Sequence, residues 1–325
     1  MNSLKITFVN VGYGEAILVR QPESGFVMLI DAGSAEAGEY ADSASGRITT
    51  DAYLNAIGLD HIDLMISTHI HEDHLCGMVP VAERLCPKAL WQTLPPGFTD
   101  TDMRDIDPAI APNPSASKFI RALNDARRLF ALVRRAGGEL RRVCAGETAE
   151  PCPGLKLTVL APTGARCDGL AGMLRDTCAT WGRDALLEAL AKLDAAMNNY
   201  SLILLLEFGG ARVLLPGDTN AAGYGDIPAD SLRADLFKVG HHGQKDGADA
   251  ALVDAVRPKL TVCCASSDRR YNSADPALMD LLRERGSGLL FSDCPPVAGE
   301  DIPPHNALTI TIDEAGGMTS VYENV

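Results

Sequence analysis

The segment Ser67–Gly77, STHIHEDHLCG, contains three of the seven histidines of the chain, with an aspartate between the last two of them. His69 and His71 are two residues apart, which points both imidazoles to the same side of an extended segment. The apolar run IDLMIST before them predicts a buried strand, and Asp73 and His74 follow in a turn that leads into a helix. Imidazole nitrogens and carboxylate oxygens together suit zinc, with manganese or iron as alternatives. The segment therefore predicts part of a catalytic metal centre, and its ligands could serve two adjacent ions.

Ligand-type residues also end two apolar strands much further along the chain. Asp218 ends the run VLLPGD, and His241 and His242 end the run LFKVGHH. One such residue alone could be a helix cap or a turn residue. Three strand ends that all carry ligand types instead predict one shared site, on loops held by a rigid scaffold. Lys238, inside the last of these strands, could stabilise developing negative charge or could face solvent.

Strand and helix patterns alternate along the chain. Runs such as LKITFVNV and GFVMLID predict strands, and SKFIRALNDARRLFALVRRAGG predicts an amphipathic helix capped by Ser117 and ended by Gly137–Gly138. We expect an α/β protein with an αββα sandwich, in which two sheets face each other and helices cover both outer surfaces. We expect a single domain over residues 1–325, with residues 95–200 as a helical insertion between its halves that forms a lid or covering segment.

Composition restricts the location and the partners of the protein. No apolar run reaches the roughly 20 residues that span a bilayer, and the start MNSLKITFVNVGYGEAILV lacks the features of a secretory signal. We therefore expect a cytoplasmic protein without membrane contact, whose nine cysteines are free thiols. The net charge of −14 disfavours binding of extended nucleic acid, although RALNDARRLFALVRRAGGELRRV could form a local basic helix or a solvated helix face.

The motifs together resemble a known family. THIHEDH resembles the H-x-H-x-D-H signature of the metallo-β-lactamase superfamily. The runs FVNVGYGEAILVR, FVMLIDAGS, NNYSLILLLEFGGARVLLPGD and LFKVGHHG are similar to segments of its ComEC-like branch, the hydrolase domain of the DNA-uptake competence channel. The similarity runs over about residues 4–313 and is weakest over residues 95–195. It implies the metallo-β-lactamase fold and a metal-dependent hydrolase.

The resemblance also implies six ligands for two divalent ions, for which we expect zinc. These are His69 and His71 for the first ion, Asp73, His74 and His241 for the second, and Asp218 as the bridge between them. Sequence alone does not distinguish His241 from His242, and we favour His241 as the ligand. His242 would then support the site from behind or donate a hydrogen bond to phosphate. Asp73 would orient the nucleophile or carry its proton, so Asp73 and His242 are the candidate catalytic residues.

The first ion is expected to lack one ligand. Most members of the superfamily with two ions have a further histidine before the Asp218 strand, whereas this chain reads AAMNNYS there. Asn198 or Asn199 stands near that place. The two unassigned histidines are His61, which we expect at the surface, and His305, which precedes the last hairpin. The first site could therefore bind its ion weakly.

Phosphodiester hydrolysis is the activity that the resemblance implies. The negative net charge favours a small phosphodiester, a nucleotide or a nucleic-acid end over a long polyanion. Tyr271 and Asn272 could line the substrate pocket or form a plain turn. The alternative function is a metal-binding regulatory or interaction module without turnover, which would work with a partner protein inside a larger system.

Overall fold

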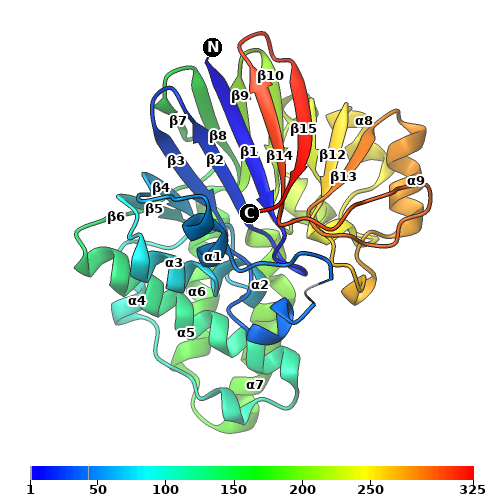
Figure 1. Cartoon of the computed structure of the whole chain (residues 1–325). Coiled ribbons are helices and arrows are strands. Elements are labelled where there is room, and N and C mark those ends of the chain that lie inside the picture. Colours follow the sequence, from blue (N-terminus) through cyan, green and yellow to red (C-terminus); the bar gives the residue numbers. More distant parts are fainter. Residues whose placement is uncertain (1, 43) are drawn as a thin grey trace.

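The computed structural model describes residues 2–42 and 44–325, and it confirms the αββα sandwich (Figure 1). The first sheet contains β1 (Ser3–Val9), β2 (Ile17–Gln21), β3 (Phe26–Ile30), β4 (Leu64–Ile66), β5 (Ala89–Gln92), β6 (Glu139–Arg142), β14 (Ala307–Asp313) and β15 (Met318–Glu323). The second sheet contains β7 (Thr148–Cys152), β8 (Leu155–Ala161), β9 (Ile203–Phe208), β10 (Ala211–Leu215), β11 (Leu236–Lys238), β12 (Leu260–Cys263) and β13 (Gly288–Phe291).

The helices are distributed along the whole chain. The α-helices are α1 (Thr50–Ala56), α2 (Glu72–Leu75), α3 (Met78–Arg84), α4 (Phe98–Thr101), α5 (Pro114–Arg135), α6 (Gly164–Ala179), α7 (Arg183–Met197), α8 (Ala250–Val256) and α9 (Pro276–Glu284). The short 3₁₀ helices are η1 (Ala37–Tyr40), η2 (Pro108–Ile110), η3 (Asn198–Tyr200), η4 (Ala221–Tyr224), η5 (Ala229–Leu232), η6 (His241–Gly243) and η7 (Arg270–Asn272).

Each sheet is antiparallel in one half and parallel in the other. The first sheet has the order β15-β14-β1-β2-β3-β4-β5-β6, and its pairs are parallel from β3 to β6. The second sheet has the order β13-β12-β11-β10-β9-β8-β7, and its pairs are parallel from β10 to β13. The parallel strands of one sheet all end at the same edge, so the loops that follow them lie together.

The core between the sheets follows from the alternation of side chains along each strand. On β1, Leu4, Ile6 and Phe8 point into this core, where they join Leu204 and Leu206 of β9 in one buried cluster. Successive side chains of a strand point to opposite faces, so the residues between them are available to the helical layer. Truncation of one such leucine to alanine typically costs about 2–5 kcal/mol of unfolding free energy.

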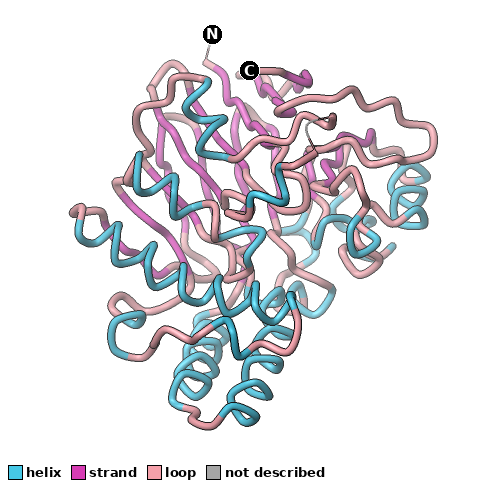
Figure 2. Tube along the Cα trace, turned by 60° about the horizontal axis from the view of Figure 1, so that its bottom comes forward, coloured by secondary structure: helices cyan, strands magenta, loops and turns pink. Residues whose placement is uncertain are grey.

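Helices cover the outer face of each sheet. Residues of α1, α3 and α5 pack on the first sheet, and residues of α8 and α9 pack on the second (Figure 1). Figure 2 brings the lower end of this view forward and shows further helices grouped beyond the ends of the strands. Among the residues that the structure describes, every helix is too short or too polar to cross a bilayer. All nine cysteines are free thiols, as the sequence predicts.

Residues 95–200 contribute to the sheets as well as to the helical layer. Within this range, β6 pairs with β5, while β7 and β8 extend the second sheet beside β9. The long helix α5 begins earlier than predicted. The helix begins at Pro114 because proline is suited to the first helical position. Its cap is Asn113, whose side chain accepts a hydrogen bond from the amide of Ala116. Ser117 therefore lies inside the helix, and Gly137 follows its end with a φ of 82° as predicted.

Candidate metal centre

The carboxyl ends of parallel strands from both sheets bring the candidate ligands together. In the first sheet, Asp31 follows β3 and the segment Ser67–Gly77 follows β4. In the second sheet, Asp218 follows β10 and the pair of adjacent histidines follows β11. Ligand sites commonly form at this end of parallel strands. The topology thus places residues from distant parts of the sequence around one point.

Four side chains form a compact donor cluster: Asp73, His74, Asp218 and His242. His242 Nε2 lies 2.9 Å from Asp218 Oδ2 and 3.1 Å from Asp73 Oδ2. His74 Nε2 lies 3.2 Å from Asp218 Oδ2, 3.4 Å from His242 Nε2 and 3.9 Å from Asp73 Oδ2. A tetrahedral ion with bonds of about 2.1 Å has ligand atoms about 3.4 Å apart. The spacing of these donors therefore fits a single divalent ion.

The outer nitrogen of each clustered imidazole has its own partner. His74 Nδ1 lies 2.8 Å from Asp31 Oδ2, and His242 Nδ1 lies 2.9 Å from the carbonyl oxygen of Cys264. Such contacts fix the orientation and tautomer of a ligand histidine. Both Nε2 atoms are thereby left to face the centre of the cluster.

His69 and His71 form the second part of the centre. His69 Nε2 lies 3.1 Å from His71 Nδ1, while His69 Nδ1 lies 3.0 Å from the hydroxyl of Thr68. The rings of His69 and His74 are neighbours, with centroids 4.3 Å apart, so the two parts of the centre are contiguous. His69 Nε2 and His71 Nδ1 are therefore the two nitrogens that could bind one shared ion.

The structure exchanges the places expected for the adjacent histidines. His242 is fully buried in the donor cluster. His241 instead directs Nδ1 to Asp246 at 2.8 Å and lines the neighbouring cavity. This differs from the expectation that His241 is the ligand and that His242 faces the substrate. Of the two histidines, His242 is the one whose Nε2 lies among the donor atoms of the cluster.

Unusual backbone conformations accompany the site. Asp31, His241 and His242 have φ values of 52°, 48° and 53°, in the left-handed region that residues other than glycine rarely adopt. Such strain often occurs where a structure must direct a functional side chain. Gly14 has a φ of 143°, and a Cβ atom there would lie 2.4 Å from the carbonyl oxygen of Asp73. The β1–β2 turn can therefore pack against the ligand loop only with glycine at this position.

The charges of the clustered groups stabilise each other. Burial lowers the pKa of His242, but Asp218 and Asp73 outweigh it and raise this pKa to about 9. The same carboxylates raise the pKa of His74 well above its usual value against the effect of burial. Burial raises the pKa values of Asp73 and Asp218, but the two imidazoles hold both below the usual range. A metal ion that binds here must therefore displace protons from His74 and His242.

His69 differs from these two histidines. Burial and the neighbouring imidazoles of His74 and His71 lower its pKa well below the usual value. His69 is therefore neutral in the metal-free protein, which is the protonation state that a metal ligand requires.

Lys238 lies beneath the centre and does not reach the cavity. It is fully buried, forms an ion pair with Glu15 and lies 3.3 Å from Asp218 Oδ1. It also donates a hydrogen bond of 2.8 Å to the carbonyl oxygen of Gly217. The pKa of Lys238 is raised because Glu15 and Asp218 outweigh its burial. Lys238 lies buried beside Asp218, so it neither faces solvent nor lines the cavity, and the structure fits neither of the two roles expected from the sequence.

A cavity of about 260 Å³ adjoins the donor atoms. Its lining includes Asp73 and Asp218 from the centre, Tyr13 from the β1–β2 turn, and Lys118 and Arg270 as cationic side chains. The Tyr13 ring lies against His242 with centroids 4.3 Å apart. Burial, followed by Asp73 and Asp218, raises the pKa of Tyr13 well above its usual value, so its phenol stays protonated.

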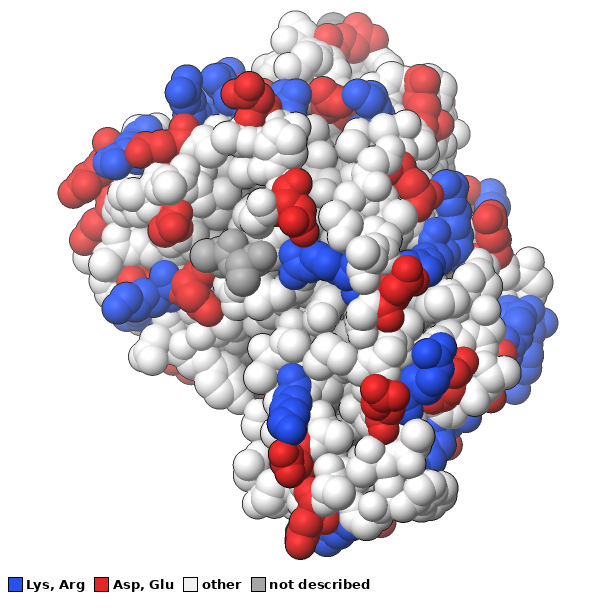
Figure 3. Space-filling model, turned by 180° about the vertical axis from the view of Figure 1, so that it is seen from behind, with Lys and Arg blue, Asp and Glu red and all other residues white. Residues whose placement is uncertain are grey.

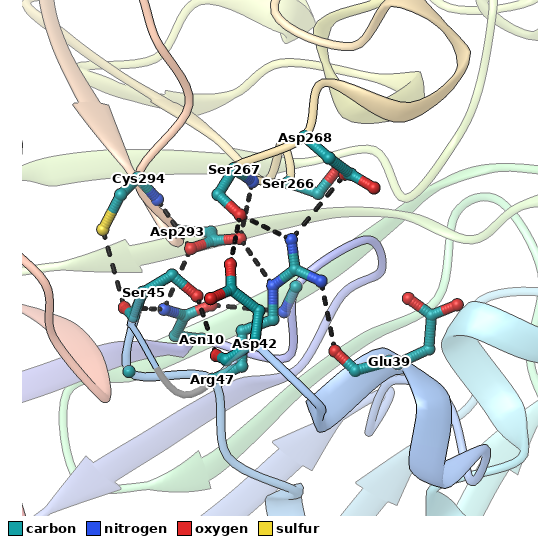
Figure 4. A network of polar contacts seen from close by, with 12 residues as sticks. Asn10, Glu39, Asp42, Ser45, Arg47, Ser266, Ser267, Asp268, Asp293 and Cys294 are labelled. Carbon is teal, nitrogen blue, oxygen red and sulfur yellow. Dashed lines mark hydrogen bonds and ion pairs between the residues drawn. The ribbon is translucent and has the colours of Figure 1, made fainter.

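A buried polar network holds one wall of this cavity (Figure 4). Arg47 Nε donates to Asp293 Oδ2 at 3.0 Å, and Asp293 Oδ2 also accepts from the amide of Ser267 at 2.7 Å. Arg47 Nη1 donates to the carbonyl oxygen of Glu39 at 3.1 Å. Glu39 in turn forms an ion pair with Arg270. The network thus joins η1 to the loop that carries Arg270.

The remaining candidates from the sequence lie outside the donor cluster. His305 directs its two ring nitrogens to the carbonyl oxygens of Pro303 and Ser292, at 2.7 and 3.0 Å, and so has no nitrogen for a metal. His61 lies at the surface beside Asp60. Asn198 lines the cavity, whereas Asn199 is not among its lining residues. Tyr271 also lines the cavity and is exposed, and Asn272 beside it completes η7.

The comparisons with known proteins agree with this geometry. The model of the metallo-beta-lactamase superfamily matches residues 9–131, which include the whole of Ser67–Gly77. ComE operon protein 3 of Bacillus subtilis (strain 168) is 23% identical over 298 residues, which are 89% of this chain and 32% of that protein. These two matches support a metallo-β-lactamase superfamily domain in this chain. The chain spans about a third of the length of this relative, and the match confirms the resemblance to the ComEC-like branch.

The solved structures to which this chain is similar have lower identities. A protein of Parabacteroides distasonis ATCC 8503, named as a metal-dependent hydrolase, is 15% identical with a TM-score of 0.45, over 90% of this chain and 94% of that one. Zn²⁺-bound PqqB from Methylobacterium extorquens is 14% identical with a TM-score of 0.43, over 86% and 84% of the two chains. The match to the superfamily model and the spacing of the donor atoms support a metal-dependent hydrolase, and the donor clusters fit divalent ions.

Several residues of the centre were not selected from the sequence. Asp31 ends an apolar strand as Asp218 does, and that pattern could have identified it. Tyr13 stands between two glycines of a tight turn, which is a weaker signal. Lys118 and Asp194 lie on helices without any motif, so only the packing of α5 and α7 reveals them.

Proposed function

We propose that this chain is a metal-dependent phosphodiesterase or nuclease that acts on a small phosphodiester, a nucleotide or a nucleic-acid end. The observation that supports this most is the convergence of two sets of donor atoms beside a single small cavity with cationic side chains. For one ion the proposed ligands are Asp73, His74, Asp218 and His242, whose donor atoms lie close together. For the other ion they are His69 and His71, which face each other, with Asp218 proposed as the bridge. We expect zinc, with manganese or iron as alternatives.

Bound divalent ions would lower the pKa of water and polarise a phosphoryl oxygen. The protein's own side chains would orient the water, accept its proton and stabilise the developing charge. Asp73 lines the cavity with its side chain 18% exposed, so it can orient the attacking water and accept its proton. Gln244 Nε2 donates to the hydroxyl oxygen of Tyr13 at 3.0 Å, which leaves the phenolic hydrogen free for the substrate. Tyr13 would stabilise the negative charge that develops on the phosphate.

The size and charge of the cavity favour a small anionic substrate. Its volume of about 260 Å³ is near the lower end for ligand pockets, which are typically about 300–1,000 Å³. Glu39 lies between Lys118 and Arg270 and pairs with both. A substrate phosphate would compete with Glu39 for these two cations. Outside the cavity, Figure 3 shows basic side chains interspersed with acidic ones on one face of the molecule, without a broad basic surface.

The helices of residues 95–200 are the parts that we propose as the cover of the site. Lys118 and Phe119 of α5 line the cavity, as does Asp194 of α7. The strands β6 to β8 of the same range belong to the two sheets and so cannot move as a lid. We propose that residues 1–325 act as one domain with this helical cover.

A non-catalytic metal-binding module remains the second candidate. The observation that favours it is the first site, where His69 and His71 face each other. Among the described residues, His61 and His305 have other partners and supply no third imidazole there. A module of this kind would bind metal but would show no turnover on any diester.

A substrate panel tests the proposal. Metal-loaded protein should hydrolyse bis(p-nitrophenyl) phosphate and remove nucleotides from end-labelled short DNA, while closed circular DNA should remain intact. Asp218→Ala, which removes the bridging carboxylate, should abolish both activities. Inert metal-loaded protein on the whole panel would favour the non-catalytic module. Rapid cleavage of circular DNA would contradict the proposed preference for small substrates and ends.

A further inference from the structure

His71 contacts a carboxylate that lies outside the histidine motif and far from it in the sequence. Its Nδ1 lies 3.1 Å from His69 Nε2, and its Nε2 lies 3.0 Å from Oδ1 of Asp194. Asp194 belongs to α7, in the helical cover. The two ring nitrogens of an imidazole point in different directions. Asp194 is therefore on the far side of His71 from the place where His69 and His71 converge.

The pattern of α7 explains why Asp194 reaches this position. Leu186, Leu190, Leu193 and Met197 are the buried residues of the helix, with the spacing of one helical face. Asp194 follows Leu190 by one turn, so it lies at the border of this face and is directed toward the protein. The same spacing leaves Glu188, which pairs with Lys192, exposed to solvent.

A second helix of the cover also holds His71. The ring of Phe119, on α5, meets the His71 ring edge-on with centroids 5.6 Å apart. His71 is thus fixed by an apolar contact from α5 and by a carboxylate from α7. His74 and His242 are instead oriented by groups that directly follow strands of the two sheets, namely Asp31 and the carbonyl of Cys264. Of the histidines described in the centre, His71 is the one that side chains of the helical cover hold.

The contact has a defined chemical effect on His71. A carboxylate that accepts the Nε2 hydrogen fixes the tautomer in which Nδ1 carries the lone pair. It also makes that lone pair more basic and prevents the ring from turning. These effects matter most in a site with few ligands, because each remaining ligand then contributes a larger share of the binding energy.

We propose that Asp194 is a positioning residue that strengthens the first metal site, in compensation for the histidine that the segment AAMNNYS lacks. Through Asp194, α7 couples the helical cover to the metal content of the protein. The inference concerns metal binding, so it does not depend on which bond the enzyme hydrolyses.

Metal titration of full-length variants tests this inference with zinc as the probe. Metal-free wild-type protein, Asp194→Ala, Asp194→Asn and Glu188→Ala would be titrated by calorimetry in the presence of a competing chelator. We expect Asp194→Ala to weaken one of the two ions about 10–100-fold and to leave the other unchanged. Asp194→Asn retains an acceptor oxygen and should lose less. Glu188→Ala, the matched carboxylate on the same helix, should bind both ions like the wild type.

Thermal unfolding of the metal-free variants separates positioning from a structural role. Asp194→Ala and the wild type should unfold at similar temperatures if Asp194 acts through His71. Wild-type affinity for both ions in Asp194→Ala would overturn the proposal. So would equal weakening of both ions together with a lowered unfolding temperature. Complete loss of one ion would also overturn it, because Asp194 would then be a ligand itself.

Discussion

The imidazole of His242 and the carboxylate of Asp218, which follow neighbouring strands of the second sheet, meet at 2.9 Å between Nε2 and Oδ2. Both groups also contact the histidine motif that follows β4, since Asp218 Oδ2 lies 3.2 Å from His74 Nε2 and His242 Nε2 lies 3.1 Å from Asp73 Oδ2. His241, the residue just before His242, does not take part in the cluster and contacts Asp246 instead. The two adjacent histidines should therefore differ sharply in their effect on metal binding.

His242→Ala should lose one of two bound ions, because it removes one of the four donors of the most complete site. His241→Ala should retain both ions and change only the interaction with substrate. Elemental analysis after exhaustive dialysis checks both variants. Metal loss in His241→Ala with full occupancy in His242→Ala would reverse the assignment.

The stability of the metal-free protein should fall as pH rises through the neutral range. The pKa of His242 is raised from 6.5 to about 9 on folding, so its contribution is complete below about pH 6.5 and is lost as pH approaches 9. The pKa of His74 is also raised, and His74 acts in the same direction. Urea unfolding at several pH values in the presence of a chelator measures this change, and His242→Gln should reduce it. Stability that is constant or increases from pH 6.5 to 9 would argue against the charged pairs.

Lys238→Met should destabilise the protein by about 3–5 kcal/mol, because it leaves Glu15 buried without a counter-charge. The double variant Glu15→Gln with Lys238→Met should recover much of this loss. The exposed pair of Lys156 and Glu207 supplies a control, since Lys156→Met should cost less than about 1 kcal/mol. The free energy of unfolding in urea gives all three values. Equal effects at the buried and exposed lysines would contradict a strongly coupled buried pair of Lys238 and Glu15.

Tyr13→Phe should lower kcat for a phosphodiester about 100-fold, because it removes a hydrogen-bond donor directed at the developing charge. Metal content should not change, since the phenol is not a proposed ligand. Tyr53→Phe removes a buried hydroxyl of α1 that does not line the cavity, and it should leave kcat unaffected. Steady-state kinetics measures both values, and equal kcat in Tyr13→Phe and Tyr53→Phe would count against the role of Tyr13.

The sequence predicted the sandwich and most strands because their apolar patterns are strong. The helix α6 was not predicted. Its buried face has the correct spacing, with Leu170 and Leu174 one turn apart, but Gly169 and Gly172 interrupt it. Each glycine inside a helix costs about 1 kcal/mol relative to alanine. Burial of the apolar face compensates for this cost, and a local pattern does not reveal such compensation.

The site was predictable only in part. The motif in Ser67–Gly77 and the strand end at Asp218 identify one group of donors by residue type and spacing. The choice between His241 and His242 depends on a left-handed backbone at both residues, which no spacing rule predicts. Asp194 contacts His71 across more than a hundred residues of sequence, and only the packing of α7 brings the two together.

The most direct test of a catalytic centre is a paired measurement of metal content and phosphodiester turnover in wild-type protein and Asp73→Ala. We predict that the wild type binds two divalent ions and hydrolyses bis(p-nitrophenyl) phosphate, and that Asp73→Ala keeps the fold, judged by circular dichroism, but loses turnover. Two results would contradict this prediction. One is wild-type protein that binds no metal when divalent ions are supplied, and the other is undiminished turnover in Asp73→Ala.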